Sequence, residues 1–197
     1  TFKEAQEILE TRLNPNEDKA FVLYKRDWHP GVIGIVASRI VEKFYRPTIM
    51  ITVVDGVGKG SARSVSNFNI YQAIKECSHL LSGFGGHKYA AGLTIEEGKI
   101  PEFVEAFKQA AARQLRPEDL TPCIHIDGEI GLHEFTPRFI RLLKLLGPFG
   151  PMNLRPIFMS RNLKVVGAPS VVGQNHLKLK VEQDGSVLDV IGFNMAT

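Results

Sequence analysis

The apolar positions in the first half of the chain recur at two different spacings. Four segments carry them at the three- and four-residue spacing of an amphipathic helix; these are 2–13, 30–44, 69–81 and 101–115. Asn14-Pro15-Asn16 is expected to end the first helix. Short β-branched or apolar runs, typical of strands, lie between the helices at 21–24, 48–54, 59–65 and 90–95. Helices alternating with strands predict an α/β or α+β domain over residues 1–116.

The second half of the chain has a different pattern. One helix is expected at 137–146, among short apolar strands separated by Gly, Pro, Asn and Asp; the expected strands are 124–130, 156–159, 163–166, 176–181 and 188–193. Several short strands with one helix favour a small β-barrel of the oligonucleotide-binding (OB) type over residues 122–197. Arg116-Pro117-Glu118-Asp119 has the composition of a linker between the two domains.

Charge is distributed unevenly along the chain. The net charge of +3 and the pI of about 8.9 are too weakly basic to indicate a partner. Residues 135–181, however, contain no Asp or Glu, and the same stretch contains eight basic residues: Arg138, Arg141, Lys144, Arg155, Arg161, Lys164, Lys178 and Lys180. Lys178 and Lys180 alternate with apolar residues, so both should project from one face of a strand.

Aromatic residues lie in the same acid-free stretch, namely Phe135, Phe139, Phe149 and Phe158, together with His176. Basic groups without neighbouring carboxylates neutralise phosphates, and aromatic rings stack on bases. The stretch therefore favours binding of a single nucleic-acid strand. A solvated basic face, with the phenylalanines in the core, would give the same pattern.

Gly60-Ser61-Ala62-Arg63-Ser64 is the first segment with candidate binding chemistry. Two hydroxyls and a guanidinium can hold a phosphate, and a glycine lets a ligand approach the backbone. On alternating strand positions, Ser61 and Arg63 would share one face. A polar strand end would have the same composition, so this segment alone decides nothing.

A second segment, Gly83 to Gly92, contains consecutive glycines followed by a histidine and a lysine. Gly85 and Gly86 predict a loop whose N–H groups form an anion-binding nest, with His87 and Lys88 beside it. A lone histidine after glycines is also typical of a turn. A third segment, Asp27 to Arg39, predicts a helix start capped by Asp27 or His29, with Pro30 in the first turn.

In this order, the three segments resemble the DHH-associated domain of RecJ-type single-strand-specific exonucleases. The similarity rests on Trp28-His29-Pro30-Gly31-Val32-Ile33-Gly34 and the following Ile35 to Arg39, on Gly60 to Ser64, and on Gly85-Gly86-His87 with Ala90-Ala91-Gly92. Segments 146–153, 155–158, 176–179 and 191–193 are similar to the OB-fold domain of the same family. The resemblance covers nearly the whole chain, and the combination is specific although each motif alone is not.

The resemblance implies the substrate-binding part of an enzyme whose cutting centre lies in another domain. In that family an N-terminal DHH domain holds Mn²⁺ or Mg²⁺ with Asp and His residues, and clustered carboxylates are needed to bridge two ions. This chain has no Asp-His-His and no compact set of Asp and His, so we expect no catalytic residue, metal site or cofactor in it.

The resemblance also assigns roles to individual residues. Gly85, Gly86 and His87 would face the catalytic cleft near the scissile phosphate, and Ser61 and Arg63 would seat a terminal phosphate or the backbone. The OB-like part would guide the strand toward the cleft. The remaining candidate contacts to nucleic acid are Ser64, Lys88, Arg155, Lys178 and Lys180.

The implied activity is 5′-to-3′ digestion of single-stranded DNA in repair and recombination, with the DHH domain as a partner. Two alternatives stay open: a DHH-family phosphodiesterase for short RNA or cyclic dinucleotides, and a non-nuclease module that binds nucleic acid or tRNA. The chain departs from the family pattern in two places. It stops at Thr197 soon after Ile191-Gly192-Phe193, which predicts a barrel one or two strands short, and Met152 stands where glycine is commoner.

Composition adds an expectation about location. Cys77 and Cys123 belong to no metal-spaced motif, which is typical of reduced thiols in a cytosolic protein. No apolar run is long enough to span a membrane and no signal peptide opens the chain. We therefore expect a cytoplasmic protein without a membrane partner. The chain opens on Thr1 rather than Met, which favours a piece of a longer protein.

Overall fold

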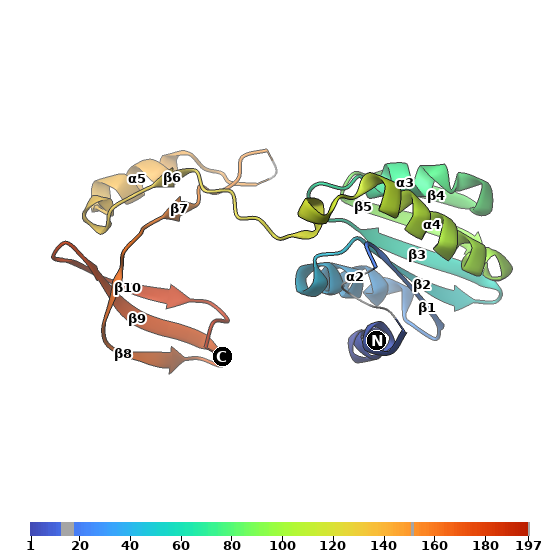
Figure 1. Cartoon of the computed structure of the whole chain (residues 1–197), viewed down its shortest axis with the longest axis horizontal. Helices are drawn as coiled ribbons and strands as arrows, with labels where there is room; N and C mark the ends of the chain where they lie inside the picture. The colour runs from blue at the N-terminus through green and yellow to red at the C-terminus, as the bar shows by residue number, and fades with distance from the viewer. Residues whose placement is uncertain (13–17, 151, 197) are drawn as a thin grey trace. The chain divides into compact units, whose positions relative to one another are not determined.

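The computed structural model describes residues 1–12, 18–150 and 152–196. They form two compact units, Thr1–Pro122 and Cys123–Thr197, which Figure 1 shows with most of their helices and strands labelled. The predicted stop of the first helix at Asn14-Pro15-Asn16 lies outside the described residues.

The first unit is a five-stranded sheet with helices on both faces (Figure 1). Its strands are β1 (Phe21–Arg26), β2 (Thr48–Val54), β3 (Val57–Arg63), β4 (Gly83–His87) and β5 (Ala90–Glu96). Its helices are α1 (Phe2–Arg12), α2 (Pro30–Phe44), α3 (Ile70–Glu76) and α4 (Ile100–Gln114), with 3₁₀ turns η1 (Ser78–Leu80), η2 (Glu97–Lys99) and η3 (Pro117–Leu120). The strand order is β1-β2-β3-β5-β4; β1 and β2 are parallel and the other neighbours antiparallel. The predicted mixed α/β class is confirmed.

Two apolar clusters, one on each face, hold this sheet. α3 and α4 pack on one face against Ile49, Ile51 and Val53 of β2 and against apolar residues of β3 and β5. On the other face, α1 and α2 pack against Phe21, Leu23 and Met50, which belong to β1 and β2. Among the described residues, β3, β5 and β4 contribute no buried apolar side chain to this second cluster. Apart from the part of β3 that α2 approaches, the same face of these strands is therefore open to other uses.

The start of α2 follows from the residues of the third motif. The N–H of Gly31 donates to His29 Nδ1 at 3.1 Å, so His29 and not Asp27 is the N-cap, and Pro30 occupies the first turn. Trp28 is buried and donates through Nε1 to Glu4 at 3.2 Å. Most of this motif thus serves helix capping and the core.

Two local predictions in the first unit are wrong. The glycine segment predicted as a loop is strand β4, which pairs with β5 along its whole length. The predicted linker Arg116–Asp119 is largely the turn η3, where Asp119 is buried and accepts the N–H of Arg116 at 3.0 Å. Each error arose because Gly, Pro and Asp disfavour regular structure locally, whereas pairing and capping here supply partners for the backbone.

Side-chain bonds to backbone carbonyls anchor the end of the first unit. Arg46 donates to the carbonyls of Asp18 and Leu120 at 3.2 and 3.0 Å, which joins two segments far apart in sequence. Lys19 donates to the carbonyls of Ala112 and Leu115 at 3.1 and 2.6 Å, at the C-terminal end of α4. The chain is therefore fixed to the first unit as far as Leu120.

The carboxylate of Asp119 gives a pH-dependent contribution to this anchor. The hydrogen bond from the Arg116 N–H, assisted by the Arg116 charge, lowers the pKa of Asp119 below its ordinary value of 3.8. A lowered folded pKa stabilises the fold above the unfolded pKa, and the contribution is lost as pH falls through the folded pKa. We expect Asp119→Asn to lower the free energy of unfolding at pH 7, with a smaller loss in acid, measured by urea titration. Glu118→Gln, at an exposed neighbour, is the control; a loss that is equal at both pH values would exclude the charge as its cause.

The second unit contains two separate small sheets. β8 (Lys164–Val172), β9 (His176–Gln183) and β10 (Ser186–Gly192) form an antiparallel sheet in the order β10-β9-β8. β6 (Gly128–Glu129) and β7 (Phe158–Met159) pair in parallel. The unit also contains α5 (Pro137–Leu145), close to its predicted position, and the turn η4 (Leu132–Glu134). The predicted strand 124–130 is wrong except at Gly128 and Glu129, because only these residues pair with a neighbouring strand.

The sheets of the second unit do not close into a barrel in the described residues, which agrees with the expectation of an incomplete barrel. Its buried apolar side chains are Ile130, Leu132 and Val181, and α5 has no buried residue. Along β8 every residue but the last is exposed. In the part of the chain that the structure describes, no helix is long and apolar enough to cross a membrane.

Candidate nucleic-acid interface

The register of three strands brings the two glycine motifs together on one face. Ser61 of β3 pairs with Gly92 of β5, and Gly92 pairs with Gly85 of β4. Because side chains alternate along a strand, every second residue lies on the same side. We call this side the open sheet face; its residues are Lys59, Ser61 and Arg63 of β3, Ala90, Gly92 and Thr94 of β5, and Gly83, Gly85 and His87 of β4. None of the nine is acidic and five of them are exposed, but Glu96, which pairs with Val57 and ends the same side of β5, is acidic and exposed.

The glycines of this face have no structural reason to be glycine. A Cβ built on Gly83 or Gly85 meets no atom within 4 Å, and one on Gly92 meets only the Gly60 carbonyl oxygen at 3.8 Å. None of the three has a positive φ. Glycine inside a strand costs stability, and one without a steric need marks a place where another chain approaches the backbone. These glycines therefore indicate a ligand surface.

The glycines line a shallow hollow of about 400 Å³, which we call the glycine hollow. Its lining comes from three adjacent strands and consists of Lys59, Gly60, Gly83, Phe84, Gly85, Gly92, Leu93 and Thr94. Backbone atoms and small side chains make most of this surface. Such a floor suits a ligand that lies along the sheet more than a compact molecule held in a deep pocket.

Gly86, by contrast, is required by the fold. Its φ is 147°, and a Cβ there would lie 2.4 Å from the Ala90 carbonyl oxygen and 2.5 Å from the Ala91 Cα. The predicted nest is also wrong, because successive N–H groups of a strand point to opposite sides and do not converge on one anion. The two adjacent glycines thus serve different purposes.

Arg63 is held in place at one end of the open sheet face. Its Nη1 donates to Ser61 Oγ at 3.0 Å and to the Ala62 carbonyl at 2.8 Å, so Ser61 and Arg63 share a face as predicted. A Cβ on Gly34 of α2 would lie 2.8 Å from Arg63 Nη2 and 2.9 Å from Ser61 Oγ. Gly34 therefore lets the helix approach the guanidinium closely. Within the described residues Arg63 has no carboxylate within 4 Å, so its charge is not neutralised by an ion pair.

His87, the last residue of β4, and Lys88 and Tyr89 in the turn that follows are all exposed. His87 Nδ1 accepts the Tyr89 N–H at 3.3 Å, and the Lys88 Nζ lies 5.1 Å from the centre of the Tyr89 ring. The Tyr89 carbonyl accepts the Ser64 N–H at 3.0 Å, and Ser64 Oγ donates to the Phe68 carbonyl at 2.8 Å. The turn is therefore both exposed and fixed, and Ser64 is one of the residues that fix it.

Pairing across the sheet places His87 beside Arg63 at the same end of the face. Arg63 pairs with Ala90, and Ala90 pairs with His87, so only one strand separates the guanidinium from the imidazole. Sequence reasoning missed Lys59, Thr94, Gly83 and Gly34 as neighbours of this site. The two-residue spacing that places Ser61 and Arg63 on one face also includes Lys59, and residues 90–96 alternate small or polar residues with apolar ones, so these signals could have found the first two.

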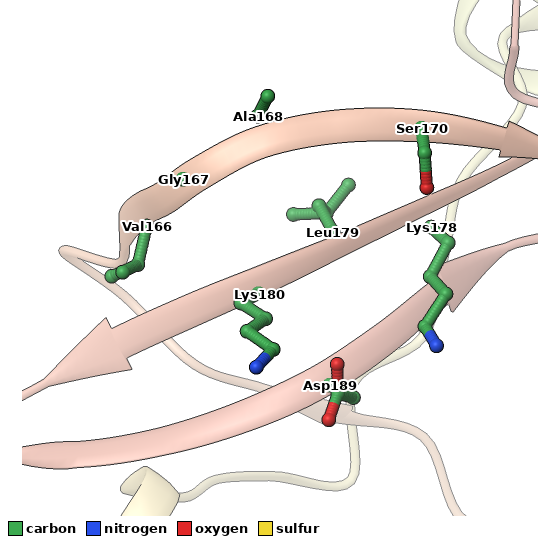
Figure 2. A pocket seen from close by; sticks show the side chains of 8 residues that line it. All are labelled: Val166, Gly167, Ala168, Ser170, Lys178, Leu179, Lys180 and Asp189. Carbon is green, nitrogen blue, oxygen red and sulfur yellow. The ribbon is translucent and has the colours of Figure 1, made fainter.

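Lys178 and Lys180 of the second unit project from one face of β9 (Figure 2). A bulge in β8 between Val166 and Ser170 opens a hollow of about 310 Å³ beside them. Asp189 of β10 pairs directly with Lys180 and lies on the same face (Figure 2). Residues 135–181 contain no Asp or Glu, but in the folded unit a carboxylate lies beside their lysines, because β10 pairs with β9. Asp189 reduces the positive potential that the two lysines produce.

Some of the other basic and aromatic candidates of this unit are exposed, and others are occupied by contacts within the unit. Arg155 is exposed, and its guanidinium lies 5.2 Å from the centre of the Phe149 ring. Arg161 is paired with Glu129 at 3.0 Å. Phe139 packs edge-on against Phe135 and Phe158, at 6.0 and 5.5 Å between ring centres. Three of the four phenylalanines in the acid-free stretch therefore contact one another, and Phe149 is the one beside an arginine.

Family models match both units. Residues 17–113 match the DHHA1 domain and residues 126–197 match the RecJ OB domain. The chain is 35% identical to the single-stranded-DNA-specific exonuclease RecJ of Bacillus subtilis and 37% identical to that of Escherichia coli, over 90% and 89% of its length. The chain belongs to the RecJ family. This RecJ-type C-terminal region spans only 23% and 31% of the length of those two relatives.

Solved structures agree with this assignment. The RecJ-type region matches RecJ of Thermus thermophilus in complex with Mn²⁺ at a TM-score of 0.73 and 30% identity, over 100% of this chain and 28% of that one. It matches the same protein with Mg²⁺ at a TM-score of 0.68. In the described residues of the RecJ-type region itself, no three His, Cys, Asp or Glu side chains lie close enough together to hold a metal ion.

Proposed function

We propose that this chain is the strand-binding part of a metal-dependent exonuclease that digests single-stranded DNA from its 5′ end, in DNA repair and recombination in the cytoplasm. The main support for the proposal is the open sheet face, because neither sterics nor backbone conformation requires glycine at its three strand glycines. The relatives named as single-stranded-DNA-specific exonucleases support the choice of substrate.

In this proposal Arg63 and Ser61 seat the terminal phosphate. The guanidinium has no carboxylate partner in the described residues, and its bond to Ser61 fixes the orientation of both donors. Gly85 allows the sugar–phosphate chain to lie against β4, and Lys88 adds positive charge at the turn. His87 lies beside the terminal phosphate, close to the position where cleavage takes place, and acts as a substrate contact. Gly86 and Ser64 maintain the strand and turn that present these groups.

The second unit guides the rest of the strand. Arg155 with Phe149 offers a charge beside a ring, a combination that binds single strands without reading their sequence. Lys178 and Lys180 add contacts to the phosphates. Because Asp189 lies opposite Lys180, the contribution of this pair to affinity is small.

Hydrolysis itself requires a further domain. Two-metal phosphodiester cleavage needs carboxylates that bridge the ions, and the described residues contain no cluster that fits a metal. We assign the Mn²⁺ or Mg²⁺ to a DHH domain of the full-length enzyme. The isolated chain should bind oligonucleotides weakly and should not hydrolyse them in the presence of Mn²⁺.

Binding of a fluorescent twenty-nucleotide single strand at increasing salt tests the proposal. Counterion release predicts that the affinity falls steeply with salt. Binding that does not depend on salt, or no binding at low salt, would contradict the proposal. Preference for a cyclic dinucleotide would favour the phosphodiesterase alternative, and preference for folded tRNA would favour the tRNA-binding alternative.

Replacement of Arg63 tests the terminal-phosphate assignment. We expect Arg63→Ala to weaken binding of a 5′-phosphorylated strand by about tenfold, because a charge-assisted contact is lost, and to weaken binding of a 5′-hydroxyl strand much less. Arg63→Lys should restore only part of the affinity, because lysine lacks the planar fork. Arg113→Ala, on α4 at the opposite face of the sheet, is the matched control. Equal losses for both strands would make Arg63 a general backbone contact.

A further inference from the structure

The glycine hollow contains Gly85 and Gly92, which lie midway along the open sheet face, and it extends from them away from Arg63. Its lining omits Arg63 and His87 and continues in the opposite direction along the strands, to Lys59, Thr94 and Gly83. These three residues form one row across the sheet, because Lys59 pairs with Thr94 and Thr94 pairs with Gly83. A ligand that began at Arg63 and followed the hollow would therefore reach this row.

The row combines a cation, a hydroxyl and a bare backbone. Lys59 is exposed and, within the described residues, has no carboxylate within 4 Å. Thr94 beside it is half-buried, and its position on the face is fixed by pairing on both sides. At the next pair on the same side, two residues beyond Thr94, Glu96 forms an ion pair with Lys99 at 3.6 Å, so its charge is partly neutralised. An ammonium next to a hydroxyl is suited to one more phosphate.

The glycine at position 83 indicates that this row binds a ligand and that Lys59 is not simply a lysine facing water. If Lys59 merely faced water, any strand-forming residue could occupy position 83, because a Cβ there meets no atom within 4 Å. Its glycine is needed only if a ligand lies against the backbone at that position too. On the open sheet face, β4 therefore presents only backbone from Gly85 to Gly83, and a ligand that extends toward Lys59 can lie against it.

The distance along β3 fixes how much ligand the face holds. Four residues separate Arg63 from Lys59, or about 13 Å at the rise of a strand. This span takes more than one sugar–phosphate repeat to bridge. The backbone positions of Ser61, Gly92 and Gly85 lie at its midpoint, while the Ser61 hydroxyl is bonded to the Arg63 guanidinium.

We propose that Lys59 and Thr94 form a second phosphate subsite, so that the open sheet face holds two consecutive nucleotides of a strand whose terminal phosphate lies at Ser61 and Arg63. The proposal rests on the proposed function for the terminal phosphate. It implies that the face senses ligand length, since a mononucleotide fills the Arg63 end and a trinucleotide also reaches Lys59.

Nuclear magnetic resonance titration of the chain with 5′-phosphorylated oligothymidylates of one to six nucleotides tests this directly. The backbone amides of Gly85 and Gly92 report on the middle of the face, and that of Gly83 reports on the Lys59 row. We expect the Gly85 and Gly92 signals to shift with every ligand, and the Gly83 signal to shift only from the trinucleotide onward. Affinity should rise about three- to tenfold at the same length.

Lys59→Ala should remove this gain for the trinucleotide and longer ligands, leave mononucleotide affinity unchanged, and lower the dependence on salt by about one ion. Lys75→Ala, on α3 at the opposite face, is the matched control, and unchanged glycine signals in the free variants would show that the fold is intact. A Gly83 signal that shifts with the mononucleotide, or a Lys59→Ala loss that is equal at all lengths, would overturn the second subsite alone. Failure of the wild-type chain to bind any of these oligonucleotides, or binding that does not depend on salt, would instead overturn the proposed function.

Discussion

Replacing Gly86 with alanine should destabilise the first unit by about 4 kcal/mol. The substitution adds the strain of a β-carbon at a φ of 147° to a clash with the Ala90 carbonyl and the Ala91 Cα, and each effect typically costs about 1–3 kcal/mol. Small domains are stable by only about 5–15 kcal/mol, so much of the margin would be lost. Urea unfolding followed by circular dichroism measures the change. Wild-type stability in this variant would show that β4 can shift to accept a side chain.

Gly85→Ala, one residue earlier, should have the opposite effect on stability and a large effect on binding. A methyl group at position 85 meets no atom of the protein, and alanine reduces the freedom of the unfolded chain. We expect a gain of about 0.5–1 kcal/mol in the free energy of unfolding. The same methyl would stand in the floor of the glycine hollow and hold a strand away from the backbone. Affinity for a 5′-phosphorylated strand should fall by about tenfold or more.

A matched control for Gly85→Ala is available in the same unit. Gly98 lies in η2, outside the open sheet face, and a Cβ there also meets no atom within 4 Å. Gly98→Ala should leave binding unchanged while it adds the same group. If Gly85→Ala were more stable and bound DNA as well as the wild type, the glycine floor would not be a ligand surface. Gain of stability with loss of binding separates a functional glycine from a structural one.

The sequence predicted most of the regular elements in the first unit, because hydrophobic periodicity reports burial directly. α2, α4 and β2 lie close to the expected ranges, since their apolar residues face a core that the spacing reveals. β4 was missed because its glycines have low strand propensity, and pairing with β5 outweighs that propensity. In the second unit the alternation of Ile124 and Ile126 suggested a strand, but no neighbouring strand pairs with them, and they are 75% and 46% exposed.

The candidate site was predictable only as far as local spacing reaches. Two-residue alternation places Ser61 and Arg63 on one face, as their hydrogen bond confirms. The position of Lys59 in one row with Thr94 and Gly83, and that of Asp189 beside Lys180, depend on which strands are neighbours, and no local pattern encodes that choice. The need for Gly34 likewise depends on how closely α2 approaches Arg63. The roles of the individual site residues remain predictions.

If both units bind one strand as proposed, the anchoring of the chain at Leu120 matters, because it leaves only a short connection between them. Arg46 holds the Leu120 carbonyl and Asp127 exchanges two hydrogen bonds with Ile157, so residues 121–126 connect these two anchors, and they form no helix or strand. Modules joined by so short a tether meet a shared ligand at a high effective concentration, on the order of millimolar. Once one unit holds a strand long enough to reach both, rebinding by the other is frequent. Two individually weak sites would then retain the strand through avidity and still release it step by step.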